Sequence, residues 1–80
     1  MKCPLCGETC RNAIWMVHHL NGVHALRCET LWSNQRVSEV WCFCGGGLDG
    51  PYLDRKVRAH WRYNGGLRTH LHAYLLGVGG

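Results

Sequence analysis

The sequence has few acidic residues, few prolines and no long apolar run. Five Asp and Glu stand against nine Lys and Arg, so the 80-residue chain carries a formal net charge of +4. This modest excess permits contact with nucleic acid but does not require it. No apolar stretch approaches the roughly 20 residues that span a bilayer, so we expect no membrane partner.

The chain is also too short to be stabilised comfortably by packing alone, because small domains bury a small fraction of their surface. Six Cys and six His are a source of further stability, through disulfides or through bound metal. The first Cys pair follows the start of the chain directly, without the apolar region and cleavage site of a secretory signal. We therefore expect an intracellular protein (cytoplasmic, or nuclear in a eukaryote) whose cysteines bind metal in a reducing compartment.

Four of these residues have a regular spacing near the start of the chain. Cys3, Cys6, His19 and His24 form the pattern C-x2-C-x12-H-x4-H. A Cys-x2-Cys segment wraps a tight turn that points both thiolates at one ion. The two His meet on one face at the end of a helix whose last turn is loosened. Together they make a closed tetrahedral zinc site, and closed sites hold structure rather than perform chemistry.

Residues 3–24 resemble the Cys2His2 zinc finger family, a ββα unit around one zinc ion. The four residues of the pattern fall on the family's ligand positions. Met16 falls at a core Leu position of the family, and Cys10 falls where the family has a core Phe. The resemblance implies a structural zinc site, with a helix that we expect from about Ala13 to Leu20. Asn12 is its expected N-cap, and Asn21-Gly22 is its expected end.

A second, less regular quartet follows in residues 42–72. Cys42-x-Cys44 precedes His60 by fifteen residues, and His70 and His72 come later. This arrangement looks like a variant finger with a broken helix. We expect a helix from Pro51 to about Tyr63, a stop at Asn64-Gly65-Gly66, and a further helix over residues 67–76. The second helix would turn back to complete the site.

His70 is the preferred eighth ligand because it shares one helical stripe with apolar residues of the last helix, whereas His72 projects from another face. The expected ligands of two zinc ions are thus Cys3, Cys6, His19, His24, Cys42, Cys44, His60 and His70. An alternative is a zinc ribbon in which Cys3, Cys6, Cys42 and Cys44 hold a single ion. It leaves both His sets unexplained, so we favour two sites.

The segment between the two quartets reads as a β-hairpin around Ser33-Asn34-Gln35. The expected organisation is a zinc finger in residues 1–24, a hairpin connector in residues 25–41 and a variant finger in residues 42–80. The fold class is a small α+β, metal-stabilised protein with two fused ββα-type units and an extra C-terminal helix. We expect a monomer.

The remaining cysteines and the tryptophans are expected mainly in the core. Cys10 and Cys28 would fill space, as buried free cysteines do. Most of the four Trp would pack inside, with one exposed as a stacking platform or partner anchor. By the resemblance, Asn12, Trp15 and His18 occupy base-reading positions. Because Trp is a poor base reader, we expect this face of the helix, with Ile14, to pack inward.

The strongest indication of a partner is a group of basic residues in the second half of the chain: Arg55, Lys56, Arg58, Arg62 and Arg68. Arg side chains suit phosphate, so these residues predict binding to the backbone of DNA or RNA rather than base readout. A zinc-stabilised protein-interaction module is the alternative. No acid–base pair with a clear role remains once the metal ligands are assigned, so we do not expect an enzyme.

Overall fold

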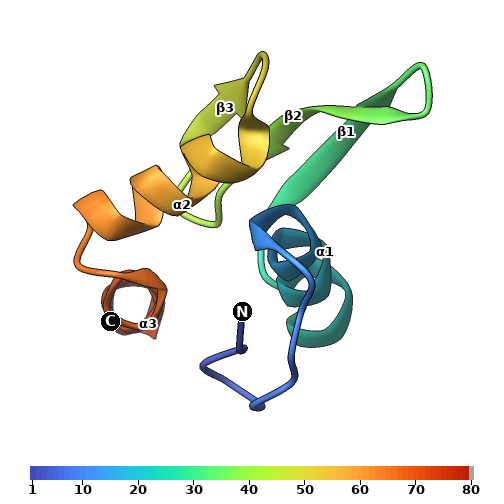
Figure 1. Cartoon of the computed structure of the whole chain (residues 1–80). Helices are drawn as coiled ribbons and strands as arrows, with labels where there is room; N and C mark the ends of the chain where they lie inside the picture. Colours follow the sequence, from blue (N-terminus) through green and yellow to red (C-terminus); the bar gives the residue numbers. More distant parts are fainter. Residues whose placement is uncertain (80) are drawn as a thin grey trace.

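The computed structural model describes residues 1–79, with side chains described up to residue 77. The elements in chain order are α1 (Ala13–His24), β1 (Glu29–Ser33), β2 (Arg36–Trp41), β3 (Gly47–Asp49), α2 (Leu53–Tyr63) and α3 (Leu67–Gly79) (Figure 1). The expected small α+β class is confirmed. Gly80, the last residue of the expected third segment, lies outside the described residues. None of the helices in residues 1–79 combines the length and apolar character needed to cross a bilayer.

Helix α1 begins where the sequence predicts, because the Asn12 side chain accepts a hydrogen bond from the Trp15 N–H at 2.9 Å. Its end differs from the expectation, since the helix continues through Gly22 to His24. The apolar face of α1 is fully buried, and this packing outweighs the weak helix propensity of one glycine. Ala25, at φ 54°, closes the helix in the left-handed conformation.

The three strands form one antiparallel sheet in the order β1-β2-β3. The loop between β1 and β2 has two residues rather than the expected three. Asn34 and Gln35 both have positive φ, at 52° and 62°, as a type I′ turn requires, and this turn matches the twist of the flanking strands. Strand β2 also pairs with β3, where Val40 lies opposite Leu48. Strand β2 therefore belongs to two hairpins.

The turn between α2 and α3 is a glycine-closed helix end. The Gly66 N–H donates to the Trp61 carbonyl at 2.7 Å, and the Gly65 N–H donates to the Arg62 carbonyl at 3.1 Å. These two bonds are those of the Schellman motif. Gly65 and Gly66 have φ values of 87° and 97°, which side chains rarely adopt. The predicted stop is thus confirmed, and α3 continues beyond the predicted Leu76.

One hydrophobic core joins both halves of the chain. Its members are four cysteines, Phe43 and residues of α1, β2, α2 and α3; the largest fully buried side chains are Met16, Leu20, Leu71, Val17, Val40 and Val57. Helices α1 and α2 are also joined by a polar contact, since the Ala13 N–H donates to Asp54 Oδ1 at 2.6 Å. A carboxylate from α2 therefore satisfies one of the unpaired N–H groups at the start of α1.

Three of the four tryptophans are exposed, contrary to the expectation that most fill the core. Trp61 is 2% exposed, whereas Trp15, Trp32 and Trp41 are 46%, 60% and 39% exposed. The hairpin of β1 and β2 extends beyond the helices, so no layer covers its outer part (Figure 1). The expected inward packing of the α1 face is likewise wrong for Trp15. A chain of this size has too little interior for four indoles.

Candidate metal centres

The structure gathers the first quartet at the N-terminal end of the chain. Cys3 Sγ lies 3.6 Å from His24 Nε2, and Cys6 Sγ lies 3.3 Å from His19 Nε2. The four ligand atoms all lie within 4.8 Å of one another. Cys3 is buried and Cys6 is exposed, so the cluster has one side in the core and one side toward solvent.

A short loop and a widened helix end position these side chains. The Cys3 N–H donates to the Glu8 carbonyl at 2.7 Å, and the Gly7 N–H donates to the Cys3 carbonyl at 2.9 Å. The expected ββ part is reduced to a single bridge between Lys2 and Thr9. At the far end of α1, the N–H groups of Ala25 and Leu26 both donate to the Leu20 carbonyl, five and six residues back. This wider last turn brings two His that are five residues apart onto one side.

The second quartet has nearly the same geometry. Cys42 Sγ lies 3.7 Å from His70 Nε2, and Cys44 Sγ lies 3.3 Å from His60 Nε2. The ligand atoms again lie within 4.8 Å of one another. The His rings of the two quartets also match, with centroids 5.1 Å apart in the first and 5.2 Å apart in the second. His70, not His72, joins the cluster, and His72 is exposed.

The Cys loop of the second quartet is a shortened version of the first. The Cys42 N–H donates to the Gly46 carbonyl at 2.9 Å, and the Gly45 N–H donates to the Cys42 carbonyl at 2.9 Å. Each bond spans one residue fewer than its counterpart at Cys3, in step with one residue rather than two between the cysteines. The loop also closes the hairpin of β2 and β3, which fixes its direction.

Phe43, the residue between the two cysteines, holds the last helix against the cluster. It is 4% exposed, and its ring centroid lies 4.8 Å from that of His70 and 5.2 Å from that of Tyr74. His70 and Tyr74 are one turn apart on α3, so Phe43 packs along the helix and aims the imidazole at the sulfurs. Sequence reasoning missed this contact, because nothing in the spacing links Phe43 to a helix so far along the chain.

Both quartets fit a tetrahedral metal ion. With metal–sulfur bonds of about 2.3 Å and metal–nitrogen bonds of about 2.0–2.1 Å, tetrahedral zinc places its S and N ligand atoms about 3.5–3.6 Å apart. The four S–N distances of 3.3–3.7 Å bracket this value. Two cysteines and two histidines in each group supply all four ligands. Each cluster can therefore hold one ion without a ligand from solvent.

Burial has opposite effects on metal binding at the two kinds of ligand in the second quartet. Burial raises the pKa of the Cys42 thiol to about 11, although the Cys44 backbone N–H lowers it. Burial, followed by the charge of His60, lowers the pKa of His70. Nε1 of Trp61 is buried and makes no hydrogen bond within residues 1–79. A divalent ion must displace the thiol protons that burial retains, whereas it requires the neutral imidazole that burial favours.

The two alternative uses of the cysteines are not observed. Each Cys pair lies with its own His pair rather than with the other Cys pair, so Cys3, Cys6, Cys42 and Cys44 do not form a joint ribbon site. All six cysteines, which lie within the described part of the chain, are free of disulfides. Cys10 and Cys28 are buried outside the clusters, and the Cys28 thiol donates to the Val17 carbonyl at 3.4 Å.

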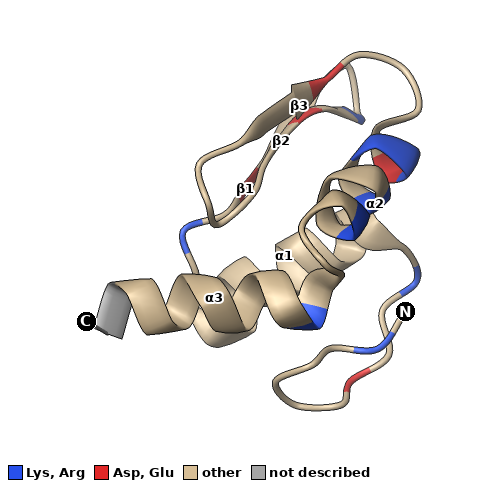
Figure 2. Cartoon of the chain, turned by 90° about the vertical axis from the view of Figure 1, so that its left-hand side faces the viewer, with Lys and Arg blue, Asp and Glu red and all other residues tan. Residues whose placement is uncertain are grey.

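The basic residues expected at a nucleic-acid interface lie on α2 and at the start of α3 (Figure 2). All five are exposed: Arg55, Lys56, Arg58, Arg62 and Arg68. Three of them make local contacts. Arg58 Nε lies 3.0 Å from Asp54 Oδ2, and Lys56 Nζ donates to the Asp49 carbonyl at 2.7 Å. The Arg55 guanidinium lies 5.7 Å from the centre of the Tyr52 ring. None of these contacts buries the cation, so the positive charge stays at the surface.

No protein-family model, no curated protein and no solved structure matches this chain. The resemblance to Cys2His2 zinc fingers therefore rests on the ligand spacing and on the two clusters themselves. The second unit follows the ββα order of that family, with the β2–β3 hairpin before α2, but takes its last ligand from a separate helix.

Proposed function

We propose that the protein binds nucleic acid through the exposed basic face of α2, and that a zinc ion in each cluster holds that face in place. The basic face comprises Arg55, Arg58 and Arg62. The observation that carries the proposal is the position of these three residues on one side of a helix whose opposite side is anchored in the core and in a metal cluster.

Zinc is the metal that best suits the donor set. Two thiolates and two imidazoles at tetrahedral spacing are the ligands of structural zinc sites, and zinc has no competing geometric preference. With four protein ligands, neither ion keeps an open position for substrate. The proposed role of both ions is therefore structural, and the protein is proposed to be a binding protein rather than an enzyme.

The spacing of the basic face follows from the amphipathic pattern of α2. Arg55, Arg58 and Arg62 are three and four residues apart, so they form one exposed stripe. Leu53, Val57 and Trp61 are buried on the other side. Asp54 is the one acidic residue of α2, and it is engaged with Arg58 and the start of α1. Guanidinium groups bind phosphate oxygens through paired N–H donors, and such contacts need no particular base sequence.

Binding can be tested with a charge reversal that has a matched control. Arg55→Glu/Arg62→Glu reverses two residues of the basic face, while Arg11→Glu/Arg27→Glu reverses two exposed residues outside it. Both double variants have a net charge of zero, so they differ only in where the charge is lost. Fluorescence anisotropy with DNA and RNA probes at low salt should show that only the first abolishes binding. Binding of the wild type should weaken steeply with salt, as released counterions require.

A protein-interaction module is the second candidate, and exposed apolar side chains favour it. Val23 at the end of α1 and Leu76 on α3 are 64% and 78% exposed. If the wild type has no measurable affinity for duplex or single strands at low salt, the nucleic-acid proposal is wrong. Equal loss of binding in the two double variants would also contradict it, because binding would then follow net charge rather than α2.

A further inference from the structure

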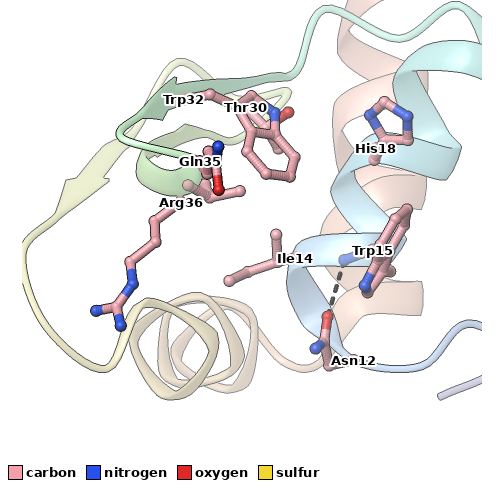
Figure 3. Close-up of a pocket in the computed structure, with 9 residues that line it drawn as sticks. Asn12, Ile14, Trp15, His18, Thr30, Trp32, Gln35 and Arg36 are labelled. Atoms are coloured by element: carbon pink, nitrogen blue, oxygen red, sulfur yellow. Dashed lines mark hydrogen bonds between the residues drawn. The ribbon is translucent and has the colours of Figure 1, made fainter.

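A groove with two exposed indoles lies between α1 and the β1–β2 hairpin. It has a volume of about 250 Å³ and is lined on its apolar side by Ile14, Trp15, Trp32 and Val37. Figure 3 shows Trp15 and Trp32 on opposite sides of this space, with Ile14 at its floor. The two indoles are 46% and 60% exposed, although a small protein gains stability by covering such surface. The groove is therefore a candidate site for a planar ligand.

The polar residues of the groove favour an anionic ligand. No carboxylate lines it, and Arg36 at its edge is its one cation, with the guanidinium directed away from the two indoles (Figure 3). Asn12 and Gln35 add amide groups; the Asn12 oxygen is engaged with the Trp15 N–H, which leaves its NH2 group as a donor (Figure 3). Stacking surfaces with amide donors beside them and a cation at the edge suit a nucleobase joined to phosphate.

The groove continues toward the basic face of α2. Ile14, Arg36 and Val37 also line a second cavity, whose other side includes Tyr52 at the start of α2. Tyr52 is 75% exposed and lies beneath the Arg55 guanidinium. Asp49 is the one acidic residue that lines this second cavity. An extended strand can thus pass from the groove by Arg36 and Tyr52 to Arg55.

We propose that the groove binds an unpaired nucleobase of a single strand, stacked on Trp15 and Trp32, while the adjoining phosphates follow Arg36 to the basic face. This inference rests on the proposed function and specifies its substrate. A base inside a duplex has both faces covered by its neighbours, so it cannot reach the indoles without being extruded. The protein should therefore prefer single strands to duplexes.

The test compares labelled oligo(dT), oligo(U) and a DNA duplex of equal length at low salt. Trp32→Ala should weaken single-strand binding by about 5- to 150-fold, the range for loss of one stacked base, and should leave duplex binding unchanged. Trp32→Phe keeps a ring and should retain most of the affinity. Trp41→Ala is the matched control, because Trp41 is exposed but lies outside the groove. Circular dichroism checks that each variant is folded, and Trp15→Leu provides a second variant on α1.

The outcomes separate this inference from the proposed function. The groove and the basic face are both supported if the wild type prefers oligo(dT) or oligo(U) to the duplex, and if this preference is lost in Trp32→Ala and kept in Trp41→Ala. Equal or tighter duplex binding, or unchanged affinity in the Trp15 and Trp32 variants, overturns the groove as a base site. The basic face then stands if Arg55→Glu/Arg62→Glu still abolishes binding. No binding by the wild type overturns both, and the groove would then be a site for a protein partner.

Discussion

The two candidate metal centres reach nearly the same ligand geometry from different amounts of regular structure. In the first, the hairpin is one bridge between Lys2 and Thr9, and both His come from a single helix. In the second, β2 and β3 form a paired hairpin, and the His come from two helices joined by a glycine turn. The outermost ligands are 21 residues apart in the first and 28 in the second.

This difference shows which parts of the chain determine the ligand geometry of each centre. The first depends on local features, a tight Cys loop and a widened end of α1. The second depends on tertiary contacts, because His70 reaches the cluster only if the Gly65–Gly66 turn closes and Phe43 packs against α3. The second centre should therefore respond to changes far from its ligands in the sequence, whereas the first should respond mainly to changes close to its own ligands.

Loss of one ligand should have the largest effect on stability. The part of the chain that loses its structure should differ between the two centres. His24→Ala and His70→Ala should each reduce the bound zinc from two ions to one in native mass spectrometry. Binding of a structural zinc ion is worth about 10–16 kcal/mol, so the loss of one ion should be the largest destabilisation in this series. In His70→Ala, α3 should also lose protection from hydrogen exchange, since the lost ligand was one of its few anchors. In His24→Ala, the start of α1 should stay protected by the Asn12 cap.

Two exposed His residues outside the clusters serve as controls. His18→Ala and His72→Ala remove neighbours of the ligands without touching either cluster, so both should retain two ions. A wild-type chain that carries one ion would contradict the assignment of two sites, and a His72→Ala variant that loses one ion would contradict the assignment of His70.

A Gly→Ala substitution should change the stability in opposite directions at the turn between α2 and α3 and in the middle of α1. Gly65→Ala should destabilise the zinc-loaded protein by about 1–2 kcal/mol, because its φ is 87° and a Cβ there would lie 3.1 Å from Thr69 Cγ2. Gly22→Ala in α1 meets nothing within 4 Å at a negative φ and should stabilise by about 0.5–1 kcal/mol. Thermal melts should differ by several degrees in opposite directions. Equal shifts of the melting temperature in the same direction would show that the conformation of the turn does not determine the stability of the second centre.

The sequence predicts the parts of this structure whose signals are local. The ligand pairs, the Asn12 cap and the Gly65–Gly66 stop each depend on a few neighbouring residues, and each was placed correctly. The exposure of Trp15 and Trp32 could not be predicted, since it depends on which layer covers the hairpin. The approach of Phe43 to His70 joins residues far apart in the sequence and has no periodic signal. Helical periodicity distinguishes the faces of His70 and His72, and His70 is the one that lies in the cluster.

A smaller effect is expected at the contact that links the two units. Asp54→Ala removes the acceptor of the Ala13 N–H and the partner of Arg58, and should cost about 1 kcal/mol, as loss of a helix cap does. Asp54→Asn keeps a side-chain oxygen and should cost less. Asp49→Asn is the control, because Lys56 bonds to the Asp49 backbone carbonyl rather than to its side chain. Urea titration gives the free energies; a cost no larger than that of the control would mean that the cap does not couple the units.

The smallest effect, one of reactivity rather than stability, concerns the two cysteines outside the clusters. Burial, followed by the charge of Cys42, raises the pKa of Cys28 to about 12, and burial raises the pKa of Cys10. Because the pKa of Cys28 in the fold exceeds its usual 9.0, the protonated thiol favours the folded state below pH 9. That contribution is lost as the pH rises from 9 toward 12.

Iodoacetamide should therefore leave both residues unmodified in the zinc-loaded protein at pH 8, since the thiolate is the nucleophile. All six cysteines should react after unfolding with a chelator. If Cys28 is modified as fast in the folded protein as in the unfolded chain, the core between the two centres must open. The two centres would then be separate units rather than parts of one core.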